Sequence, residues 1–481
     1  MAATRHDAGP DESSRLTNFG GNQIWQARCY QPRSEQDVLD ILQRRRQGKV
    51  RALGALHSWS DVAVSSDVVL DMGWLDQVRT FTQDGAAFVQ VGAGCRLQDL
   101  LDRLHAGTDR TLPTLGAITR QTISGAISTG THGSGRQSLS HFVAAVRMAA
   151  YDAAGNPTIL EYSGGEALRA ARCALGCMGV ILSVDLPTVP KYLVEETLCG
   201  HGSVQSVLGR YRDRPLTQFI LVPYRWTYLA WERRAVDMRT RTTGEWLRAW
   251  LFRAYNKIGV DVTFHLLLKT AIAIGDSAAK MLMKLMRYLM ITGVTRIDDA
   301  EHVLTLSHHY FRHEEMEIFV PEQRLQEAVD VLRCATVVFA GETTSVPEGI
   351  AETLRAHGLL DDLIRHAGTY VQHYPFFFRR VLPEDTLISM AAGAEQPLYS
   401  ISVFTYLAPD KRAAYYAFCA WLARCMTVMF DARLHWGKHF AVSAADVARA
   451  YPNLDTFKQL CRAADPNGVF RNAYSERVLG L

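Results

Sequence analysis

The sequence of 481 residues predicts an α+β protein, in which a half of alternating strands and helices precedes a half built on an antiparallel sheet. Two observations predict this division. Short apolar strand segments alternate with amphipathic helical segments up to Pro187 and Pro190, which form the best candidate boundary. Beyond these prolines, longer segments with alternating apolar residues indicate antiparallel strands covered by helices.

The first half begins with a helix. Residues 34–37, Ser-Glu-Gln-Asp, form a capping motif, and apolar residues over 38–42 supply the buried face. The elements that follow alternate between strand and helix: strands near 68–70 and over 88–91, a helix over 97–104, a helix over 166–174 and a glycine-bracketed strand over 175–184.

The glycines that follow the strand over 88–91 do not make a dinucleotide-binding fingerprint. Gly92 and Gly94 are correctly spaced, but Leu97 stands where the third glycine belongs. The fingerprint also needs a βαβ unit with an acidic residue after the next strand. The sequence therefore argues against a Rossmann-type site.

The second half is predicted to contain strands over 315–320 and 399–406, where apolar residues alternate. Its most apolar region is 249–295, which Lys269, Asp276, Lys280, Lys284 and Arg287 interrupt, so it holds no uninterrupted apolar span of membrane length. We expect two amphipathic helices that pack on a core in this region. Peripheral membrane contact and an oligomer interface are the alternatives.

Composition excludes several classes of protein. An apolar fraction of 48%, a charged fraction of 21% and a net charge of +3 are those of a soluble globular protein that does not bind nucleic acid. Residues 1–16 are polar and lack the apolar core of a secretory signal. Nine cysteines are scattered without framework spacing. We therefore expect a cytoplasmic protein with reduced thiols and no metal site.

Two glycine-containing segments indicate a bound ligand. Gly54 breaks a β-rich run and is followed by His57 and Ser58, and consecutive turn amides there would suit a diphosphate. An imidazole at the end of such a loop is placed to meet a cofactor, although a lone loop histidine is more often structural or solvated. Residues 115–135 are rich in Gly, Ser and Thr, which is typical of backbone close to a ligand or of a tightly packed turn region.

Together these segments resemble the vanillyl-alcohol-oxidase superfamily of flavoproteins, and above all its sugar branch of alditol, gulonolactone and arabinonolactone oxidases. The resemblance extends from the first helix to residues 465–474, whose sequence DPNGVFRNAY is similar to the C-terminus of that branch. It implies an FAD-binding domain of two α+β subdomains over 1–190 and a substrate-binding cap with an antiparallel sheet over 191–440. A C-terminal segment over 441–481 would return towards the FAD domain.

The resemblance also implies which residues hold FAD. His57 aligns with the histidine that bonds covalently to the flavin 8α-methyl group, and residues 52–58 would wrap the pyrophosphate. The residues implied to contact the cofactor are Ala52, Leu53, Gly54, Ala55, Leu56, His57, Ser58, Gly116, Ala117, Thr122, Gly125, Thr129, Gly130, Thr131, His132, Val180 and Ile181.

On the substrate side, Arg379, Thr405 and Lys438 align with active-site residues of the sugar branch. A fixed cation near the flavin can stabilise its reduced form and hold a substrate oxygen. Phe377 stands where that branch usually has a glutamate, and Ala117 stands where alditol oxidases have a serine. These changes remove a carboxylate and a hydroxyl, so we expect a pocket that accepts a larger or less polar alcohol.

The implied activity is that of an FAD-dependent oxidase, which passes hydride from a CH–OH group to flavin N5 and reduces O2 to H2O2. The substrate would be an alditol, a sugar lactone or a less polar alcohol. Because Phe377 replaces the glutamate, Lys438, His435 and His439 are candidate bases. Gly116 matches a position where a small residue admits oxygen. The alternatives are a flavin dehydrogenase or reductase for a lipid or sterol-like substrate, and a flavin-binding protein with decayed catalysis.

Overall fold

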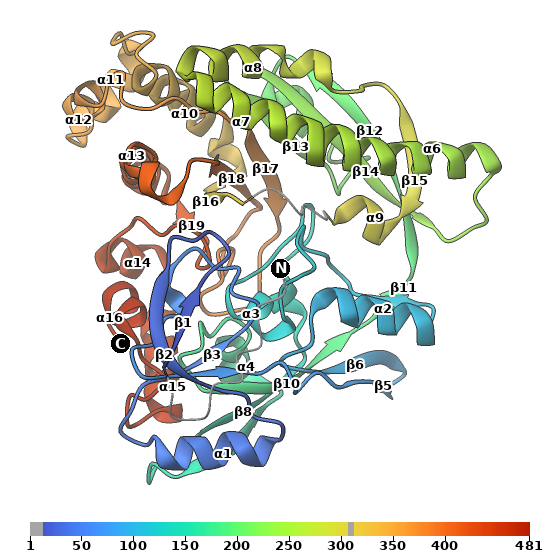
Figure 1. Cartoon of the computed structure of the whole chain (residues 1–481), viewed down its shortest axis with the longest axis vertical. Coiled ribbons are helices and arrows are strands. Elements are labelled where there is room, and N and C mark those ends of the chain that lie inside the picture. Colours follow the sequence, from blue (N-terminus) through green and yellow to red (C-terminus); the bar gives the residue numbers. More distant parts are fainter. Residues whose placement is uncertain (1–12, 306–311) are drawn as a thin grey trace.

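The computed structural model describes residues 13–305 and 312–481, and most of the polar N-terminal segment lies outside these ranges. The described chain has two parts. Three small sheets with their helices form the lower part in Figure 1, and one large sheet with its covering helices forms the upper part. The predicted α+β class is confirmed.

The first sheet carries the loop with His57. Its strands are ordered β1 (Ser13–Thr17), β2 (Ile24–Tyr30), β4 (Val68–Asp71) and β3 (Val50–Leu53). Strands β2 and β3 both run parallel to β4. Helix α1 (Glu35–Arg44) begins at Ser34, whose side chain accepts from Asp37 N–H in the predicted capping box.

The second sheet is antiparallel and follows the order β5 (Val78–Gln83), β6 (Ala86–Gly92), β10 (Val180–Pro187), β8 (Ala145–Tyr151) and β9 (Pro157–Tyr162). Strands β7 (Arg110–Thr111) and β11 (Val189–Pro190) form a small pair. The helices of this region are α2 (Leu97–Gly107), α3 (Ile123–Ser128), α4 (Gly165–Ala171) and the 3-10 turns Asp61–Ala63 and Leu139–Phe142.

The strand predicted over 175–184 begins only at Val180. Leu175 and Gly176 have φ angles of 52° and 70°, so the chain turns there before it enters the sheet. This turn places Leu175, Gly176 and Gly179 beside the loop that follows β3, where they line a cavity with it.

The large sheet has eight strands in the order β15 (Thr295–Asp299), β12 (Tyr192–His201), β14 (Thr227–Asp237), β13 (Gln218–Val222), β17 (Phe376–Val381), β18 (Leu398–Thr405), β16 (Glu314–Pro321) and β19 (Arg433–Leu434). The helices around it are α5 (Val204–Leu208), α9 (Ala300–Leu304), α10 (Leu325–Phe339), α11 (Glu348–Ala356), α12 (Leu360–Arg365) and α13 (Ala413–Phe430), with 3-10 turns at Glu322–Arg324 and Pro409–Lys411.

Strand β16 was predicted from its alternating pattern, but it is not solvated on either face. Residues 314–320 are all buried. Helices α10 and α13 contact the strand, and the segment around His435 and His439 donates backbone hydrogen bonds to Glu317 and Glu315. The charged residues of β16 therefore lie inside the protein.

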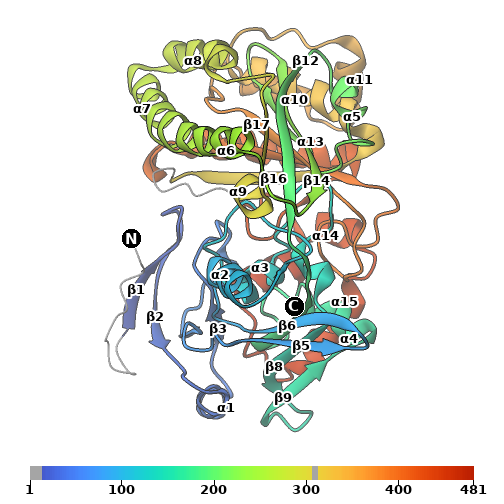
Figure 2. The ribbon, with the colours of Figure 1, turned by 90° about the vertical axis from the view of Figure 1, so that its right-hand side faces the viewer.

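The apolar region forms two long helices, as predicted. The first consists of α6 (Thr243–Tyr255), a π-helical stretch (Asn256–Phe264) and α7 (His265–Ile274), and α8 (Asp276–Leu289) follows after Gly275. These helices lie over the large sheet at the upper edge of the molecule (Figure 2). They bury Phe264, Leu268 and Met283 but leave many apolar side chains exposed. We call α6, the π-helical stretch, α7 and α8 the helical hairpin.

The C-terminal helices α14 (Ala444–Ala450), α15 (Leu454–Ala464) and α16 (Ala473–Leu479) lie beside the lower part of the molecule (Figure 1). Val50 N–H donates to Val469 O at 2.9 Å, and the Asn472 side chain donates to the carbonyls of Asp61, Val62 and Val64. Of the described helices, α13 has the length and hydropathy of a membrane span, but most of it is buried in the core.

Candidate active site

Two adjoining cavities form the candidate site, one within the lower part and one between the lower part and the large sheet. The first is lined mainly by residues 51–58, by six residues between Gln121 and Thr129, and by Leu175, Gly176, Gly179 and Ile181, and we call it the cofactor cavity. The second, the catalytic cavity, is lined by residues of β16, β17, β18 and the segment 435–438. His57, Ser58, Gln121 and Thr129 line both cavities. His57 therefore stands where the two meet.

The loop after β3 is built to present His57. Leu56 has a φ angle of 56°, which is uncommon for a residue with a side chain. Phe19 N–H donates to Leu56 O at 2.8 Å, and the Phe19 ring lies 4.9 Å from the imidazole. A Cβ on Gly54 would come within 2.6 Å of Thr122 Oγ1, so glycine is needed where the loop meets α3.

The environment of His57 favours its neutral form. Burial, together with the positive charges of Arg120, Lys438 and Arg96, lowers the pKa of His57 to about 4. The imidazole therefore keeps an unprotonated ring nitrogen at neutral pH, and this lone pair is what a bond to an electrophilic carbon requires.

The cofactor cavity suits an anionic, phosphate-containing group. Among the described residues that line it, the polar ones are hydroxyls, amides, His57 and Arg51, and none is acidic. The Arg51 side chain donates to the carbonyls of Gly176 and Phe470, which fixes the walls of the cavity to one another. Backbone amides and hydroxyls without a competing carboxylate match the chemistry of a diphosphate. The lining thus fits FAD.

The segment 435–438 is tied directly to the His57 loop. Trp59 N–H donates to Gly437 O at 2.8 Å, and Ser60 Oγ donates to Trp436 O at 2.6 Å. The Lys438 ammonium consequently lies 4.4 Å from the centre of the Trp59 ring and forms an ion pair with Glu315. The lining of the catalytic cavity therefore includes a fixed ammonium group.

Arg379 and Glu317 form the polar centre of the catalytic cavity. Arg379 Nη1 lies 3.5 Å from Glu317 Oε1, and His132 Nε2 lies 3.2 Å from the same oxygen. Burial by itself raises the pKa of Glu317, but His132, His435 and Lys438 together hold it well below its ordinary value. Glu317 is therefore an anion among cations and donors.

His132, Glu317 and His435 are metal-type ligands whose nitrogen and oxygen atoms lie within 4.8 Å of one another. Arg379 supplies positive charge to this group at the carboxylate. His132 Nδ1 lies 2.9 Å from Gly133 O. His132 Nε2 faces Glu317.

His435 is placed to donate a hydrogen bond. Burial lowers its pKa well below the ordinary value, so the ring is neutral. Its Nδ1 accepts from Gly437 N–H at 3.1 Å, and Nε2 must then carry the ring proton. In this tautomer His435 can donate a hydrogen bond into the cavity. It does not present the free ring nitrogen there that its predicted role as a base would need.

Aromatic side chains form the remaining wall of the catalytic cavity. Phe377, Tyr374, Phe404 and Tyr406 line it together with Trp59. Tyr374 and Phe377 stack at 5.9 Å with an interplanar angle of 7°, and Phe404 meets the edge of Phe377 at 5.4 Å. The expected apolar character of the pocket around Phe377 is present.

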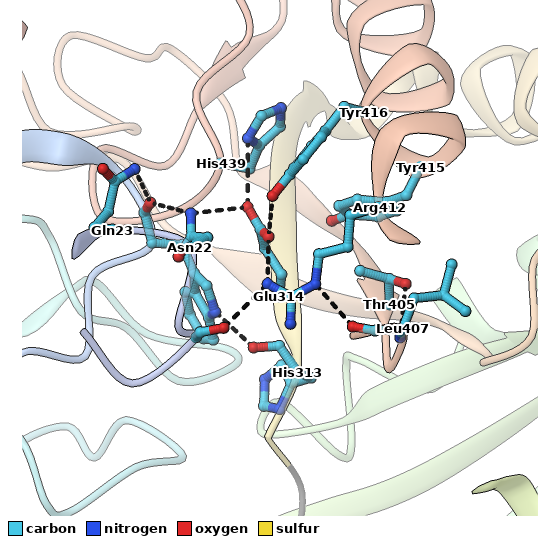
Figure 3. A network of polar contacts seen from close by, with 12 residues as sticks. Asn22, Gln23, His313, Glu314, Thr405, Leu407, Arg412, Tyr415, Tyr416 and His439 are labelled. Carbon is cyan, nitrogen blue, oxygen red and sulfur yellow. Dashed lines mark hydrogen bonds and ion pairs between the residues drawn. The ribbon is translucent and has the colours of Figure 1, made fainter. Parts of the chain in front are cut away.

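Thr405 does not line the catalytic cavity, contrary to the sequence-based prediction. It is the last residue of β18 and pairs with Glu314, so its side chain points to the face opposite Phe404. Figure 3 shows Thr405 beside Leu407, whose N–H donates to Thr405 Oγ1 at 3.3 Å. Phe404 and Tyr406 take the positions in the cavity.

His439 also lies away from the catalytic cavity. Its Nδ1 is 3.5 Å from Glu314 Oε1, and its ring stacks on Tyr416 at 4.8 Å (Figure 3). Arg412 and Asn22 contact the same carboxylate at 2.8 and 3.1 Å. His439 thus belongs to a structural network that joins the start of β16 to α13 and the N-terminal strands.

Most of the residues predicted to hold the cofactor line one of the two cavities. Residues 52–58, Thr122, Gly125, Thr129 and Ile181 line the cofactor cavity, and Ala117, Thr131 and His132 line the catalytic cavity. Gly116, Gly130 and Val180 line neither. A Cβ on Gly116 would meet the Thr131 methyl at 2.5 Å, and one on Gly130 would meet Met390 at 2.7 Å, so these glycines serve close packing. Val180 belongs to the core.

The sequence reasoning missed Glu315 and Glu317. It also missed Gln121, Trp59, His313, Tyr374, Phe404 and Tyr406, which line the catalytic cavity. A signal for the two glutamates was present, since they stand two residues apart in a strand whose other side chains are mostly apolar. Alternate residues share one face of a strand, so two carboxylates at this spacing indicate a polar site.

Comparisons with known proteins agree with this geometry. Residues 184–478 match the family model "D-arabinono-1,4-lactone oxidase", and residues 27–156 match "FAD binding domain". A long-chain alcohol oxidase from an uncultured marine euryarchaeote is 36% identical over 97% of this chain and 98% of its own. The L-gulono-1,4-lactone dehydrogenase of Mycobacterium tuberculosis is 27% identical over 96% and 99%.

A solved structure shares the fold. Cholesterol oxidase from B. sterolicum superimposes with a TM-score of 0.70 and 14% identity over 98% of this chain and 99% of its own. The family model, the FAD-binding match and the cavities lead to one conclusion. The chain belongs to the D-arabinono-1,4-lactone oxidase family and is an FAD-dependent oxidoreductase of the vanillyl-alcohol-oxidase superfamily that acts on CH–OH groups.

Proposed function

We propose that this enzyme oxidises a long-chain alcohol to the aldehyde. The observation that carries the proposal is the aromatic wall of the catalytic cavity, where Phe377 and three further aromatic rings stand beside a polar side that includes Arg379 and Glu317. A sugar lactone would need polar partners along its whole length, whereas a fatty alcohol needs them only at its hydroxyl. The 36% identical relative is a long-chain alcohol oxidase, which supports the same substrate class.

The polar centre can bind and deprotonate the hydroxyl. Glu317 is anionic and accepts a hydrogen bond from the substrate O–H, while the Arg379 guanidinium donates to the substrate oxygen. Bound FAD supplies the hydride acceptor for the carbinol carbon. As the carbonyl forms, the hydroxyl proton passes to the Glu317 carboxylate, and Arg379 stabilises negative charge on the oxygen.

We further propose that His57 is the covalent attachment site of FAD. Its neutral imidazole lies where the two cavities meet, and the Phe19 ring and the positive φ of Leu56 fix its position. A covalent bond would fix the position of the cofactor relative to the catalytic cavity without further contacts.

Molecular oxygen is the proposed electron acceptor. Gly116 stands at the position where a small residue admits oxygen in related flavoproteins, and a side chain there would also displace Thr131, which lines the catalytic cavity. Rapid-mixing reoxidation of the reduced enzyme by air tests this. A slow reaction with O2 combined with a fast reaction with an artificial acceptor would establish a dehydrogenase instead.

We propose that the enzyme is cytoplasmic and binds membranes peripherally through the helical hairpin. Trp250, Leu266 and Ile274 are 50%, 57% and 74% exposed. Exposed basic residues, among them Arg248, Lys269 and Lys284, lie on the same helices and would contact anionic lipid headgroups. An apolar surface with aromatic and basic residues is typical of helices that lie in a membrane interface.

A panel of substrates tests the main proposal. Peroxide release would be measured with primary alcohols of 4 to 16 carbons, with alditols and with sugar lactones, all at equal enzyme flavin content. We expect the highest kcat/KM for long-chain alcohols. A preference for a lactone or an alditol would overturn the assignment.

A further inference from the structure

A third cavity lies between the large sheet and the helical hairpin. It has a volume of about 270 Å³, and its walls are mainly apolar. Its floor is formed by residues of β12, β13 and β14, including Leu198, Ile220 and Trp231, and its roof by residues of the hairpin, including Phe264, Leu267 and Met286. Neither the cofactor nor the polar centre requires this space.

The third cavity shares a wall with the catalytic cavity. Tyr374 and Phe377 line both. Trp231 stacks on Phe377 at 6.1 Å with an interplanar angle of 20°, and Tyr374 stacks on the ring at 5.9 Å. Among the described residues, the two that line both spaces, Tyr374 and Phe377, are aromatic.

Both cavities lie on one face of the large sheet. Phe377 pairs with Ile220 in the neighbouring strand, and two residues further along Arg379 pairs with Gln218, which pairs with Trp231. Because alternate residues share a face, Arg379 and Phe377 project to the same side as these cavity residues. A chain attached to a hydroxyl at Arg379 can therefore continue along the sheet once the Phe377 ring rotates.

The outer end of the third cavity reaches the surface through apolar residues. Leu267, Leu289, Ile291 and Val294 line the cavity and are also exposed. This rim is continuous with the exposed apolar side of the helical hairpin. Apolar residues thus extend from the surface to the shared wall at Phe377.

We infer that the third cavity binds the alkyl chain of the substrate and that Phe377 is the gate between this chain and the reacting hydroxyl. The inference rests on the proposed oxidation of long-chain alcohols and assigns their chain a binding site. Each methylene buried in such a space improves kcat/KM roughly fourfold until the cavity is filled.

The test uses the flavin-loaded enzyme and a matched pair of variants. Val294 lines the cavity and is 38% exposed, whereas Val262 is 37% exposed and does not line it. V294W places an indole at the rim, and V262W makes the same change on the neighbouring surface. With monomeric primary alcohols of 4 to 14 carbons, we expect V294W to lower kcat/KM at least tenfold for the long alcohols and hardly at all for butanol. V262W should retain the chain-length profile of the unmodified enzyme.

A binding measurement separates this inference from the proposed function. 12-Bromododecanol in the third cavity should quench Trp231 fluorescence, so quenching should be larger in the unmodified enzyme than in W231F. Quenching without turnover of any alcohol would retain the chain site and overturn the proposed function. The opposite result would overturn the chain site and retain the function. In that case the enzyme oxidises long alcohols, V294W and V262W change kcat/KM equally, and quenching is the same in the unmodified enzyme and in W231F.

Discussion

Arg379 Nη1 lies 3.5 Å from Glu317 Oε1, although β18 separates their strands. Ser402 in β18 pairs with Phe377 on one side and with Glu317 on the other, so Glu317 lies in the same row as Phe377, two strands away. Two strand spacings are about 10 Å, a distance that a long arginine side chain can bridge along the sheet. The site therefore contains a carboxylate even though Phe377 occupies the position where the sugar branch has its glutamate.

Substitution of Glu317 should abolish proton acceptance without removing the cofactor. We expect E317Q to lower kcat by roughly 10²–10⁴-fold, the usual contribution of a general base, and to remain yellow. Rapid-mixing measurements of flavin reduction with a long-chain alcohol would report this directly. E315Q is the control, because Glu315 pairs with Lys438 and does not contact Arg379. A fully active E317Q enzyme would contradict the role of Glu317.

Protonation of Glu317 should not lower the rate constant of flavin reduction in mildly acidic solution. Its pKa lies well below the ordinary value near 4.5, so the carboxylate is ionised in neutral and mildly acidic solution. Protonation would remove activity only below that value. A fall in the rate constant of reduction between pH 7 and pH 6 would assign the base to another group.

Covalent flavin should depend on His57 and tolerate acid. Acid-precipitated protein should stay yellow, and H57A should release its flavin into the supernatant. Because the pKa of His57 is about 4, its neutral form is present above that value. Attachment of FAD to the unloaded protein should therefore be as complete at pH 5.5 as at pH 7.5. If all the flavin of the unmodified protein appears in the supernatant after acid precipitation, covalent attachment is excluded.

Stability should fall in acid because of His373. This fully buried imidazole accepts from Tyr406 N–H at 3.0 Å, and burial lowers its pKa to about 4. In the unfolded chain the pKa is about 6.5, so the unfolded state binds more protons between these values. The contribution of His373 is complete above pH 6.5 and decreases by about 1.4 kcal/mol per pH unit down to pH 4.

The variant H373Q isolates this contribution. Urea unfolding of H373Q and of the unmodified protein would be compared at pH 4.5, 5.5 and 6.5. We expect the variant to lose stability less steeply on acidification, by about 1.4 kcal/mol per unit. Parallel stability curves for the two proteins would show that His373 does not titrate as the structure requires.

Membrane binding should require the exposed apolar side chains of the helical hairpin. Trp246 and Trp250 are 51% and 50% exposed on α6. We expect W246E/W250E to lose co-sedimentation with vesicles of phosphatidylcholine and phosphatidylglycerol and to keep its activity on monomeric alcohols. The control R355E/R365E changes charge at exposed arginines of α11 and α12. Vesicle binding that survives in W246E/W250E would place the contact elsewhere.

Much of the fold could be predicted from local signals. The capping box at Ser34, the leucine spacing of α2 and the alternating residues of β18 identified elements at nearly their observed bounds. The burial of β16 could not be predicted in this way. Its alternating pattern does not show that both faces are covered; α10 and α13 contact the strand, residues 435–439 bond to its edge, and Glu315 and Glu317 are internal as a result.

The cofactor loop could be predicted from the sequence, because Gly54 and His57 stand three residues apart in one local turn. The substrate side was decided by tertiary structure. Arg379, Glu317, His132 and Lys438 come from four segments, and strand register and the contact between Trp59 and Gly437 bring them together. Register placed Thr405 on the far face and placed Glu317 in the row of Phe377, within reach of the Arg379 side chain. Side-chain facing alternates along a strand, so one residue of offset decides which groups reach the substrate.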